Sequence, residues 1–597
     1  MPWTLETDPL GSTALSAAVA SLAIVYLFWA LAWRRMKGHW AATSALAIAV
    51  ACAIFGFGMP AKLALLATLN GACFGLWPIA WIVVAGLFLF NLSVRTGQFE
   101  IIKASLAAIT DDRRIQALLI AFSFGAFIEG CAGFGTPVAI TAAMLVGLGF
   151  EPLYAAGLCL LANTAPVAFG SIGIPIIVGA QSSGVDPMAL SQMVGRTLPC
   201  VSLIVPFYMV TVMSGWRRGL EVWPAALVTG GSFALTQGLT ANYLGPMLPD
   251  IAASIVSIVC LTAFLRLWRP RQSWVFAHEA AATGRTPLRH AGGEVLRAWA
   301  PFIVLSIFVA AWGVKPIKEV LDCCSAIKVP FPGLHEMVVR DGKPMSAVFN
   351  FNVLSAAGTA VFLAALVSIP VMGATWRLAV RVFVDTLVTV RWPIVTMAAI
   401  LGFAYIMNFS GMAIALGNAF AMTGFLFPFF AAFLGWLGVF MTGSDTSSNA
   451  LFGKLQEVTA TQIGIDPLVT VSANSAGGVC GKMISPQSLA VATASAGLVG
   501  REGDIFRFTL KHSLLLTAAI GVIAYLEAHA FPWIIPVAHA AGSAAVAAAP
   551  VAAAASPLEA EGIPYLAAAM ALVLVVAASA ILAGRKRPGP AAESRAD

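Results

Sequence analysis

The chain has 597 residues, of which 59% are hydrophobic and only 10% are charged. A soluble protein of this length needs far more charge to cover its surface, so the composition excludes an ordinary soluble fold. The formal net charge is +7, but the basic residues stand in short loops beside apolar segments, as membrane orientation signals do. The charge therefore predicts a lipid bilayer as the surrounding medium and no nucleic-acid partner.

Apolar stretches long enough to span a bilayer recur from Ala14 to Ile581, since a spanning helix needs roughly 20 mostly apolar residues. The first, Ala14 to Trp33, is too long for a signal peptide and follows no basic stretch, so we interpret it as a permanent span. Clusters of Lys and Arg resist translocation and mark cytoplasmic loops. Such clusters stand near 34–37, 95–114, 217–218, 266–297, 377–391, 501–511 and 585–587.

All of these clusters fall on the cytoplasmic side only if two apolar segments, near 116–150 and near 425–458, enter and leave the membrane on the same side. Each segment is interrupted by small and polar residues, which membrane-buried backbone tolerates only beside protein or a water-filled cavity. We interpret both as re-entrant hairpins. The pattern then predicts about 13 full spans, an external N-terminus and a cytoplasmic C-terminus.

The predicted fold is an all-α polytopic membrane protein made of two inverted-topology repeats with re-entrant hairpins and broken helices. Residues 1–270 form the first repeat, and 271–350 supply a cytoplasmic loop, one span and an external loop. Residues 351–597 form the second repeat, the final span and a cytoplasmic tail, with an Ala-rich external loop at 540–555. The triplets at 162–164 and 473–475 match between the halves, and each is followed by Pro or Gly, which predicts a helix break.

Small and polar residues at the hairpins and breaks are the predicted substrate-binding residues. Half-helix N-termini in such repeats aim N–H groups at an anion near the membrane midplane, glycines let backbone approach a ligand, and hydroxyl and amide groups hydrogen-bond it. The candidates are Gly133, Gly135, Thr136, Asn163, Thr164, Ser444, Thr446, Ser447, Asn474, Ser475 and Lys482. Tight helix packing by small residues is the alternative for the glycines. A dinucleotide fingerprint is excluded, because no strand precedes the glycine string.

Ionisable residues inside apolar segments are costly and mark function; here they are Glu129, Asp445, Lys454 and Lys482. Glu129 and Asp445 are the predicted proton-coupling residues, because burial favours the protonated form of a carboxyl. The alternative is a structural role, in which each carboxylate pairs with Lys454 or Lys482 or caps a half-helix. Lys482 attracts the substrate carboxylate or, alternatively, snorkels to the interface.

Four segments together carry a resemblance to a known family: FSFGAFIEGCAGFGTPVAI, LLANTAPVAFGSIGIP, GSDTSSNALFGKLQ and NSAGGVCGKMISPQSLAVA. They resemble the L-lactate permease family over about residues 10–585. The resemblance implies proton symport of L-lactate, D-lactate and glycolate across the bacterial cytoplasmic, or inner, membrane. It also implies kinship with the ion transporter superfamily, whose members use Ser-Asn-Thr motifs at hairpin tips. The first hairpin has Gly-Phe-Gly-Thr instead, which puts a sodium site at that tip in doubt.

These observations predict a secondary active transporter of small 2-hydroxymonocarboxylates, without a cofactor or metal. A sodium-coupled carboxylate symporter and a monocarboxylate anion channel remain as alternatives. An enzyme is not expected, because no nucleophile–base or metal constellation stands at membrane depth. The sequence does not rank lactate against glycolate, since one methyl group is worth only about 1 kcal/mol. It also leaves open which acid carries the proton and how many copies of the chain assemble.

Overall fold

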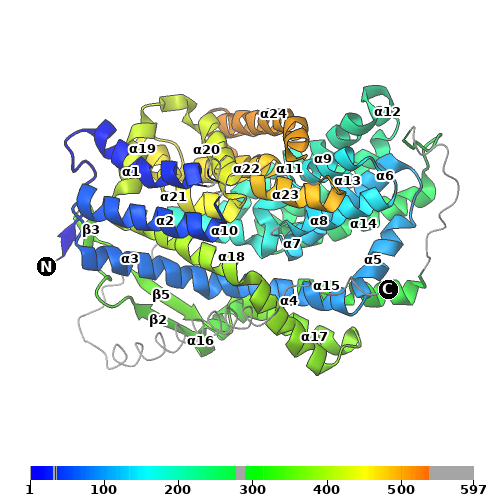
Figure 1. Cartoon of the computed structure of the whole chain (residues 1–597), viewed down its shortest axis with the longest axis horizontal. Coiled ribbons are helices and arrows are strands. Elements are labelled where there is room, and N and C mark those ends of the chain that lie inside the picture. The colour runs from blue at the N-terminus through cyan, green and yellow to red at the C-terminus, as the bar shows by residue number, and fades with distance from the viewer. Residues whose placement is uncertain are drawn as a thin grey trace, which may run out of the picture.

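The computed structural model describes residues 2–30, 34, 36–133, 135–276, 290–313, 315–340, 342–498 and 501–536. These residues are mostly helical, and most helices run along the long axis of the molecule (Figure 1). The predicted Ala-rich loop, final span and cytoplasmic tail lie outside the described residues, as does most of the predicted loop after residue 270.

The helices before residue 270 are α1 (Thr13–Phe28), α2 (Gly38–Ala51), α3 (Ala61–Phe74), α4 (Trp81–Arg95), α5 (Gln98–Ala107), α6 (Arg113–Ala117), α7 (Gly125–Cys131), α8 (Thr136–Gly147), α9 (Pro152–Ala162), α10 (Gly170–Ser183), α11 (Pro187–Ser214), α12 (Trp216–Leu220), α13 (Trp223–Tyr243) and α14 (Pro249–Leu267). Short π or 3₁₀ segments connect or extend them: η2 (Cys52–Gly56), η3 (Gly75–Ala80), η4 (Leu118–Phe124) and η5 (Val167–Phe169).

The helices after residue 290 are α15 (Gly292–Gly313), α16 (Lys315–Ser325), α17 (Ala357–Val371), α18 (Trp376–Ser410), α19 (Met412–Ala421), α20 (Phe427–Thr442), α21 (Asp445–Gln462), α22 (Pro467–Gly481), α23 (Pro486–Ala496) and α24 (Glu502–His529). The 3₁₀ segments here are η6 (Gly424–Leu426), η7 (Lys482–Ile484) and η8 (Pro532–Ile534).

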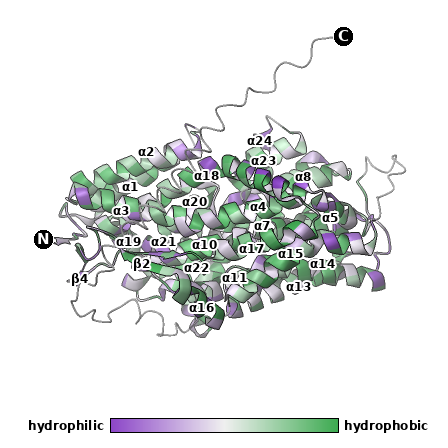
Figure 2. Ribbon diagram, turned by 90° about the horizontal axis from the view of Figure 1, so that it is seen from below, coloured by the Kyte–Doolittle hydropathy of each residue, from purple (hydrophilic) through white to green (hydrophobic). Residues whose placement is uncertain are grey.

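Within the described ranges, nine helices are long and apolar enough to cross a membrane, or ten if the bent pair at Pro152–Ala162 and Val167–Ser183 is one span. Four apolar helices are shorter, and two of them, α1 and α17, coincide with predicted spans near 14–33 and 351–373. Hydrophobic residues dominate along the helices, while hydrophilic residues gather mainly towards the ends of the long axis (Figure 2). Large apolar side chains such as Phe55 and Leu235, 87% and 65% exposed, face outwards, which suits contact with lipid.

The stretch after α15, predicted as an external loop to about residue 350, departs from the prediction of an all-α fold. It contains α16 and short strands, β2 (Ala326–Pro330), β3 (Val338–Arg340), β4 (Lys343–Pro344) and β5 (Val348–Asn352). β2 pairs antiparallel with β5, β3 pairs with β4, and β1 (Trp3–Thr4) runs parallel to β3. Within these strands, residues 327–329 (IKV) and 349–352 (FNFN) alternate apolar and polar side chains, which suits paired strands with one covered face.

Two helical hairpins project into the centre of the molecule. In the first, η4 and α7, which continue α6, pack against α8; in the second, α20 packs against α21. The open end of the first hairpin is held beside α12, at the right of Figure 1, where the Arg114 guanidinium donates to the Arg218 carbonyl at 2.6 Å. The second hairpin opens towards the left, beside α19. The tips of both hairpins therefore approach the middle of the long axis from opposite directions.

Helix α22 corrects the prediction of a break at 473–475. Asn474 and Ser475 lie inside a continuous helix, and the interruption comes only at η7. The physical reason is that the glycines around them pack against another helix instead of breaking this one. A Cβ on Gly477 or Gly481 would collide with backbone of α20 at Ala432 or Trp436. The predicted alternative of small-residue packing applies here.

Candidate functional site

The first polar cluster is centred on Glu129, which lies in α7 with only 3% of its surface exposed. The Lys482 Nζ donates to Glu129 Oε1 at 2.7 Å, and the Asn163 Nδ2 donates to Oε2 at 3.1 Å. These three residues come from the first hairpin, the end of α9 and η7. Both carboxylate oxygens therefore have partners, one of them cationic.

The tip of the first hairpin depends on glycine. Gly133 and Gly135 have φ angles of +57° and +83°, which side-chain-bearing residues rarely adopt. A Cβ on Gly133 would collide with the Ser171 hydroxyl, so the tip packs directly against the start of α10. Thr136 closes the turn by donating its hydroxyl to the Gly133 carbonyl. The two glycines and Thr136 thus set the position at which α7 ends beside Glu129.

The break between α9 and α10 lies directly against the Glu129 carboxyl. Asn163 caps the end of α9, and the chain then bends by 63° before α10. Ser171, Ile172 and Gly173 all have positive φ, which is strained backbone for the first two residues. A Cβ on Gly170 would lie 2.7 Å from Glu129 Oε1, so only glycine leaves room for the carboxylate there.

The second polar cluster is centred on Asp445, the first residue of α21 after the hairpin tip. Its Oδ2 accepts from the Ser475 hydroxyl at 2.7 Å and, more weakly, from Asn449 Nδ2 at 3.4 Å. The same Asn449 nitrogen lies 3.0 Å from the Pro175 carbonyl oxygen, which joins the second hairpin to α10. Asp445 makes no ion pair with any residue that the structure describes, and its Oδ1 has no hydrogen-bond partner there.

Amide side chains extend this second cluster along α21 and α22. Asn474 donates to Asn449 Oδ1 at 2.8 Å and accepts at its own Oδ1 from Gln456 at 3.0 Å. Gln456 also donates to the Ala431 carbonyl in α20. Asn474 is therefore engaged at both ends of its amide, whereas the Asn163 Oδ1 in the first cluster is buried without a partner among the described residues.

The segment formed by α22 and η7 joins the two clusters. Ser475 and Gly478 face Asp445, and a Cβ on Gly478 would collide with Asp445 Oδ1. Lys482 follows one turn later and reaches Glu129. Asp445 and Glu129, the two predicted proton-coupling acids, therefore contact neighbouring turns of the segment formed by α22 and η7.

Several predicted site residues serve local structure. Thr164 donates its hydroxyl to the Leu161 carbonyl, and Ser444 caps α21 by accepting from the Ser447 backbone N–H. Thr446 stands between Ser444 and Ser447 in the chain and is half-buried. Lys454 pairs with Glu457 at 2.5 Å, not with Asp445. Of the two predicted ion-pair partners, only Lys482 contacts a candidate acid.

Sequence reasoning missed Asp250, a third buried acid beside the first cluster. Its side chain is 1% exposed, its Oδ1 is 3.5 Å from Gln237 Nε2, and its Oδ2 has no partner among the described residues. A Cβ on Gly130 would lie 2.9 Å from the Asp250 Cβ, so this acid packs against the backbone next to Glu129. Asp250 follows Pro249 at the start of an apolar stretch, where it reads as an ordinary flanking residue.

Sequence reasoning missed Asn449 and Gln456 as well, although both lie within the segment GSDTSSNALFGKLQ. Amides in an amphipathic stretch carry no sequence signal that separates a buried network from a solvated face. Among the described residues, no group of three His, Cys, Asp or Glu side chains is arranged to hold a metal ion.

A family model described as L-lactate permease matches residues 16–531. The chain belongs to the L-lactate permease family. It is 50% identical over 551 residues to the glycolate permease GlcA of Escherichia coli, covering 89% of this chain and 98% of that one. It is 49% identical over 563 residues to the L-lactate permease of Bacillus subtilis, covering 90% and 100%. Both relatives are permeases, so this family member is a multi-pass membrane transport protein and not an enzyme.

Among solved structures, the Alcanivorax borkumensis YdaH transporter is similar with a TM-score of 0.43 and 14% identity, over 79% of this chain and 89% of that one. A likeness of this degree decides neither the topology nor the substrate.

Proposed function

We propose that this chain is a secondary active transporter that carries L-lactate, D-lactate and glycolate across the bacterial inner membrane together with protons. The printed names of its relatives, L-lactate permease and glycolate permease, support the substrate class, since both substrates are small 2-hydroxymonocarboxylates. The buried clusters around Glu129 and Asp445 support a site for an anion and a proton at membrane depth.

The observation that carries this proposal is the buried ion pair between Lys482 and Glu129. A substrate carboxylate that binds Lys482 takes the cation away from Glu129. Glu129 then stands in a low-dielectric site without a counter-charge, and binding a proton removes that cost. One proton therefore enters with each anion, and the loaded site keeps the same net charge as the empty one.

The substrate hydroxyl requires a partner close to this pair. Asn163 is better suited than Asn474, because its Oδ1 is free of partners in the described chain while the Asn474 amide is engaged at both ends. A Cβ on Gly133 would lie 3.4 Å from Glu129 Oε1, so the tip around Gly133, Gly135 and Thr136 supplies backbone close to the substrate. In this scheme Lys482 binds the carboxylate and Asn163 accepts the hydroxyl hydrogen.

Asp445 is the second candidate for the coupled proton, because it is buried without a cation in the described chain. One observation at the same place favours sodium coupling as a second candidate function. The Asp445 Oδ2, the Ser475 Oγ and the Pro175 carbonyl oxygen all lie within 3.4 Å of one nitrogen, Asn449 Nδ2. Oxygens that converge in this way also suit a small hard cation.

We further propose the inverted-repeat architecture for this transporter, with residues 1–270 and 351–597 as repeats, 271–350 as the connection, and about 13 spans in all. The opposite directions of the two hairpins in Figure 1 support this assignment. The arginine-bearing end around Arg114 and Arg218 then faces the cytoplasm. The hairpins and α9–α10 move together against the remaining helices as access alternates.

Uptake of labelled L-lactate into proteoliposomes, with a proton or a sodium gradient imposed one at a time, tests the proposal. We expect uphill accumulation with the proton gradient alone. Glu129→Gln is expected to lose this accumulation while retaining lactate counterflow. Accumulation driven only by sodium would replace proton coupling by the second candidate, and downhill flux insensitive to both gradients would indicate a channel. Full proton-driven accumulation in both Glu129→Gln and Asp445→Asn would exclude these acids as carriers.

A further inference from the structure

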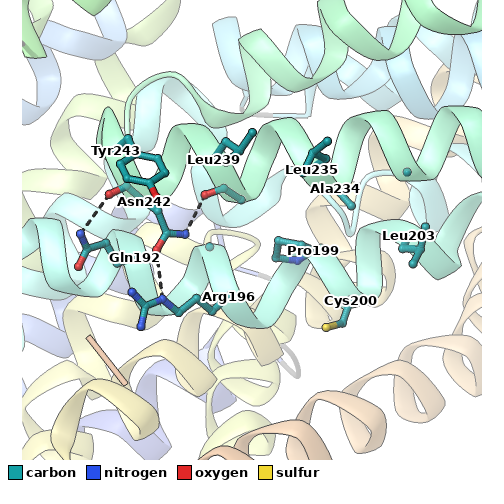
Figure 3. A pocket seen from close by; sticks show the side chains of 13 residues that line it. Gln192, Arg196, Pro199, Cys200, Leu203, Ala234, Leu235, Leu239, Asn242 and Tyr243 are labelled. Carbon is teal, nitrogen blue, oxygen red and sulfur yellow. Dashed lines mark hydrogen bonds between the residues drawn. The ribbon is translucent and has the colours of Figure 1, made fainter. Parts of the chain in front are cut away.

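An open groove of about 690 Å³ runs along the surface between α11 and α13 (Figure 3). None of its lining residues belongs to the two polar clusters. Its apolar end is lined by Pro199, Leu203, Leu235 and Leu239, and the last two side chains are 65% and 50% exposed. Gly231 and Gly238 also line the groove, and because they have no side chain they leave its space open. This end of the groove is apolar and faces outwards, as a surface in contact with lipid does.

The other end of the groove is polar and contains Arg196, with Gln192, Asn242 and Tyr243 around it (Figure 3). The Arg196 Nε donates to Asn242 Oδ1 at 3.1 Å, and Nη1 donates to the Ile534 carbonyl. No acidic side chain in the described ranges pairs with this guanidinium, and its Nη2 makes no hydrogen bond there. The nearby acid Glu527 instead accepts from Thr197 at 2.8 Å. Arg196 thus has no acidic partner and has unused donors in the described chain.

Two exposed aromatic residues mark the level of this charge relative to the bilayer. Tyr243 lines the polar end and is 77% exposed, and Trp533, next to Ile534, is 72% exposed. Tyr and Trp prefer the boundary between headgroups and hydrocarbon, where their rings are apolar on one side and wet on the other. The guanidinium therefore lies at the depth of lipid headgroups, and the leucine-lined end extends into the hydrocarbon.

We propose that this groove binds an anionic glycerophospholipid, with its phosphate on Arg196 and one acyl chain along Pro199, Leu203, Leu235 and Leu239. Charge complementarity selects this occupant, because an unpaired arginine beside hydrocarbon requires an anion. A zwitterionic lipid brings its own cation close to the guanidinium. A second copy of the chain, placed by a two-fold axis on this groove, would set one Arg196 against the other.

Lipid retention by the full-length protein tests this site without any measurement of transport. The protein is purified in mild detergent, exchanged into phosphatidylglycerol or phosphatidylcholine, and weighed by native mass spectrometry. We expect bound phosphatidylglycerol in the native protein and, in Arg196→Gln, affinity that is weaker by about fivefold or more. Arg196→Lys should retain part of the binding. Arg501→Gln is the matched control, because Arg501 directly precedes α24, does not line the groove and pairs with Asp504.

A second variant tests the acyl-chain end separately. A Cβ on Gly231 meets nothing within 4 Å, so Gly231→Leu fills the groove without disturbing the fold. It should weaken phosphatidylglycerol binding while leaving Arg196 intact, and Gly293→Leu, also in open space, should not. Equal retention by Arg196→Gln and native protein, unaltered binding in Gly231→Leu, or equal binding of phosphatidylcholine would overturn the proposal. So would a dimer without bound lipid that Arg196→Gln dissociates, because the occupant would then be a second copy.

Discussion

Lys482 Nζ lies 2.7 Å from Glu129 Oε1, although the two residues are 353 positions apart in the chain. The contact joins the first hairpin to η7, and α22, which directly precedes η7, contacts Asp445 through Ser475. A change at any of these residues therefore acts on both hairpins.

The Glu129–Lys482 pair should be strongly coupled in stability. Glu129→Gln or Lys482→Gln alone leaves one buried charge without its partner, which costs about 3–5 kcal/mol. The double variant removes both charges and should cost clearly less than the sum. Thermal unfolding of the four proteins in one detergent measures the cycle. Glu100→Gln is the control, because the Lys103–Glu100 pair is far more exposed, at 27% and 66%, and should contribute no more than about 1 kcal/mol. Additive losses at Glu129 and Lys482 would contradict the coupling.

Gly478→Ala should impair transport far more than its size suggests. The added methyl group collides with Asp445 Oδ1 and displaces the carboxylate from Ser475. We expect proton-driven lactate uptake to fall by about tenfold or more, since small displacements in a binding site have effects of that order. Gly147→Ala adds the same methyl group to α8 in open space and should leave uptake unchanged. Equal uptake by both variants would show that Asp445 has room to move.

Asp250→Asn should retain both folding and proton-driven uptake. Asp250 has no cationic partner in the described chain, so an ionised side chain there would cost several kcal/mol. Asparagine keeps the shape and the contact with Gln237 without the charge. Asp250→Ala instead removes only the long contact to Gln237, which still donates to the Ala165 carbonyl at 3.0 Å, and should cost about 1 kcal/mol. The measurements are expression, thermal unfolding and lactate uptake. Loss of proton-driven uptake with intact counterflow in Asp250→Asn would identify Asp250, rather than Glu129, as the proton carrier.

Arg114 should anchor the open end of the first hairpin. Its guanidinium is fully buried and bonds to Asp112 and Glu221 at 2.8 Å each, and to the Gln272 carbonyl at 3.1 Å. Arg114→Gln removes the cation beside the buried Asp112, which then keeps only the backbone N–H donors of residues 114 and 274, and should destabilise the protein by about 3 kcal/mol or more. The neighbouring Arg113→Gln is the control, because that side chain is only half-buried. Similar unfolding temperatures for the two variants would show that the anchor is dispensable.

Family membership and the burial of Glu129 and Asp445 could be predicted from the sequence, because each has a local signal. A carboxyl in an apolar segment and glycines beside it stand out within about 20 residues of chain. Short strands were missed, since five-residue alternation is a weak pattern. Asp250 was missed because proline and an acid at the start of a helix are common without any function.

The amino-acid sequence by itself determined the membrane class and the family, because hydropathy and long motifs are properties of contiguous residues. Only the tertiary structure decided that Lys482, not Lys454, pairs with Glu129, that Asn474 lies inside a helix, and that Asp250 joins the first cluster. The physical reason is that partners hundreds of residues apart are selected by helix packing, which at Gly170, Gly477 and Gly478 depends on the space left by a missing side chain.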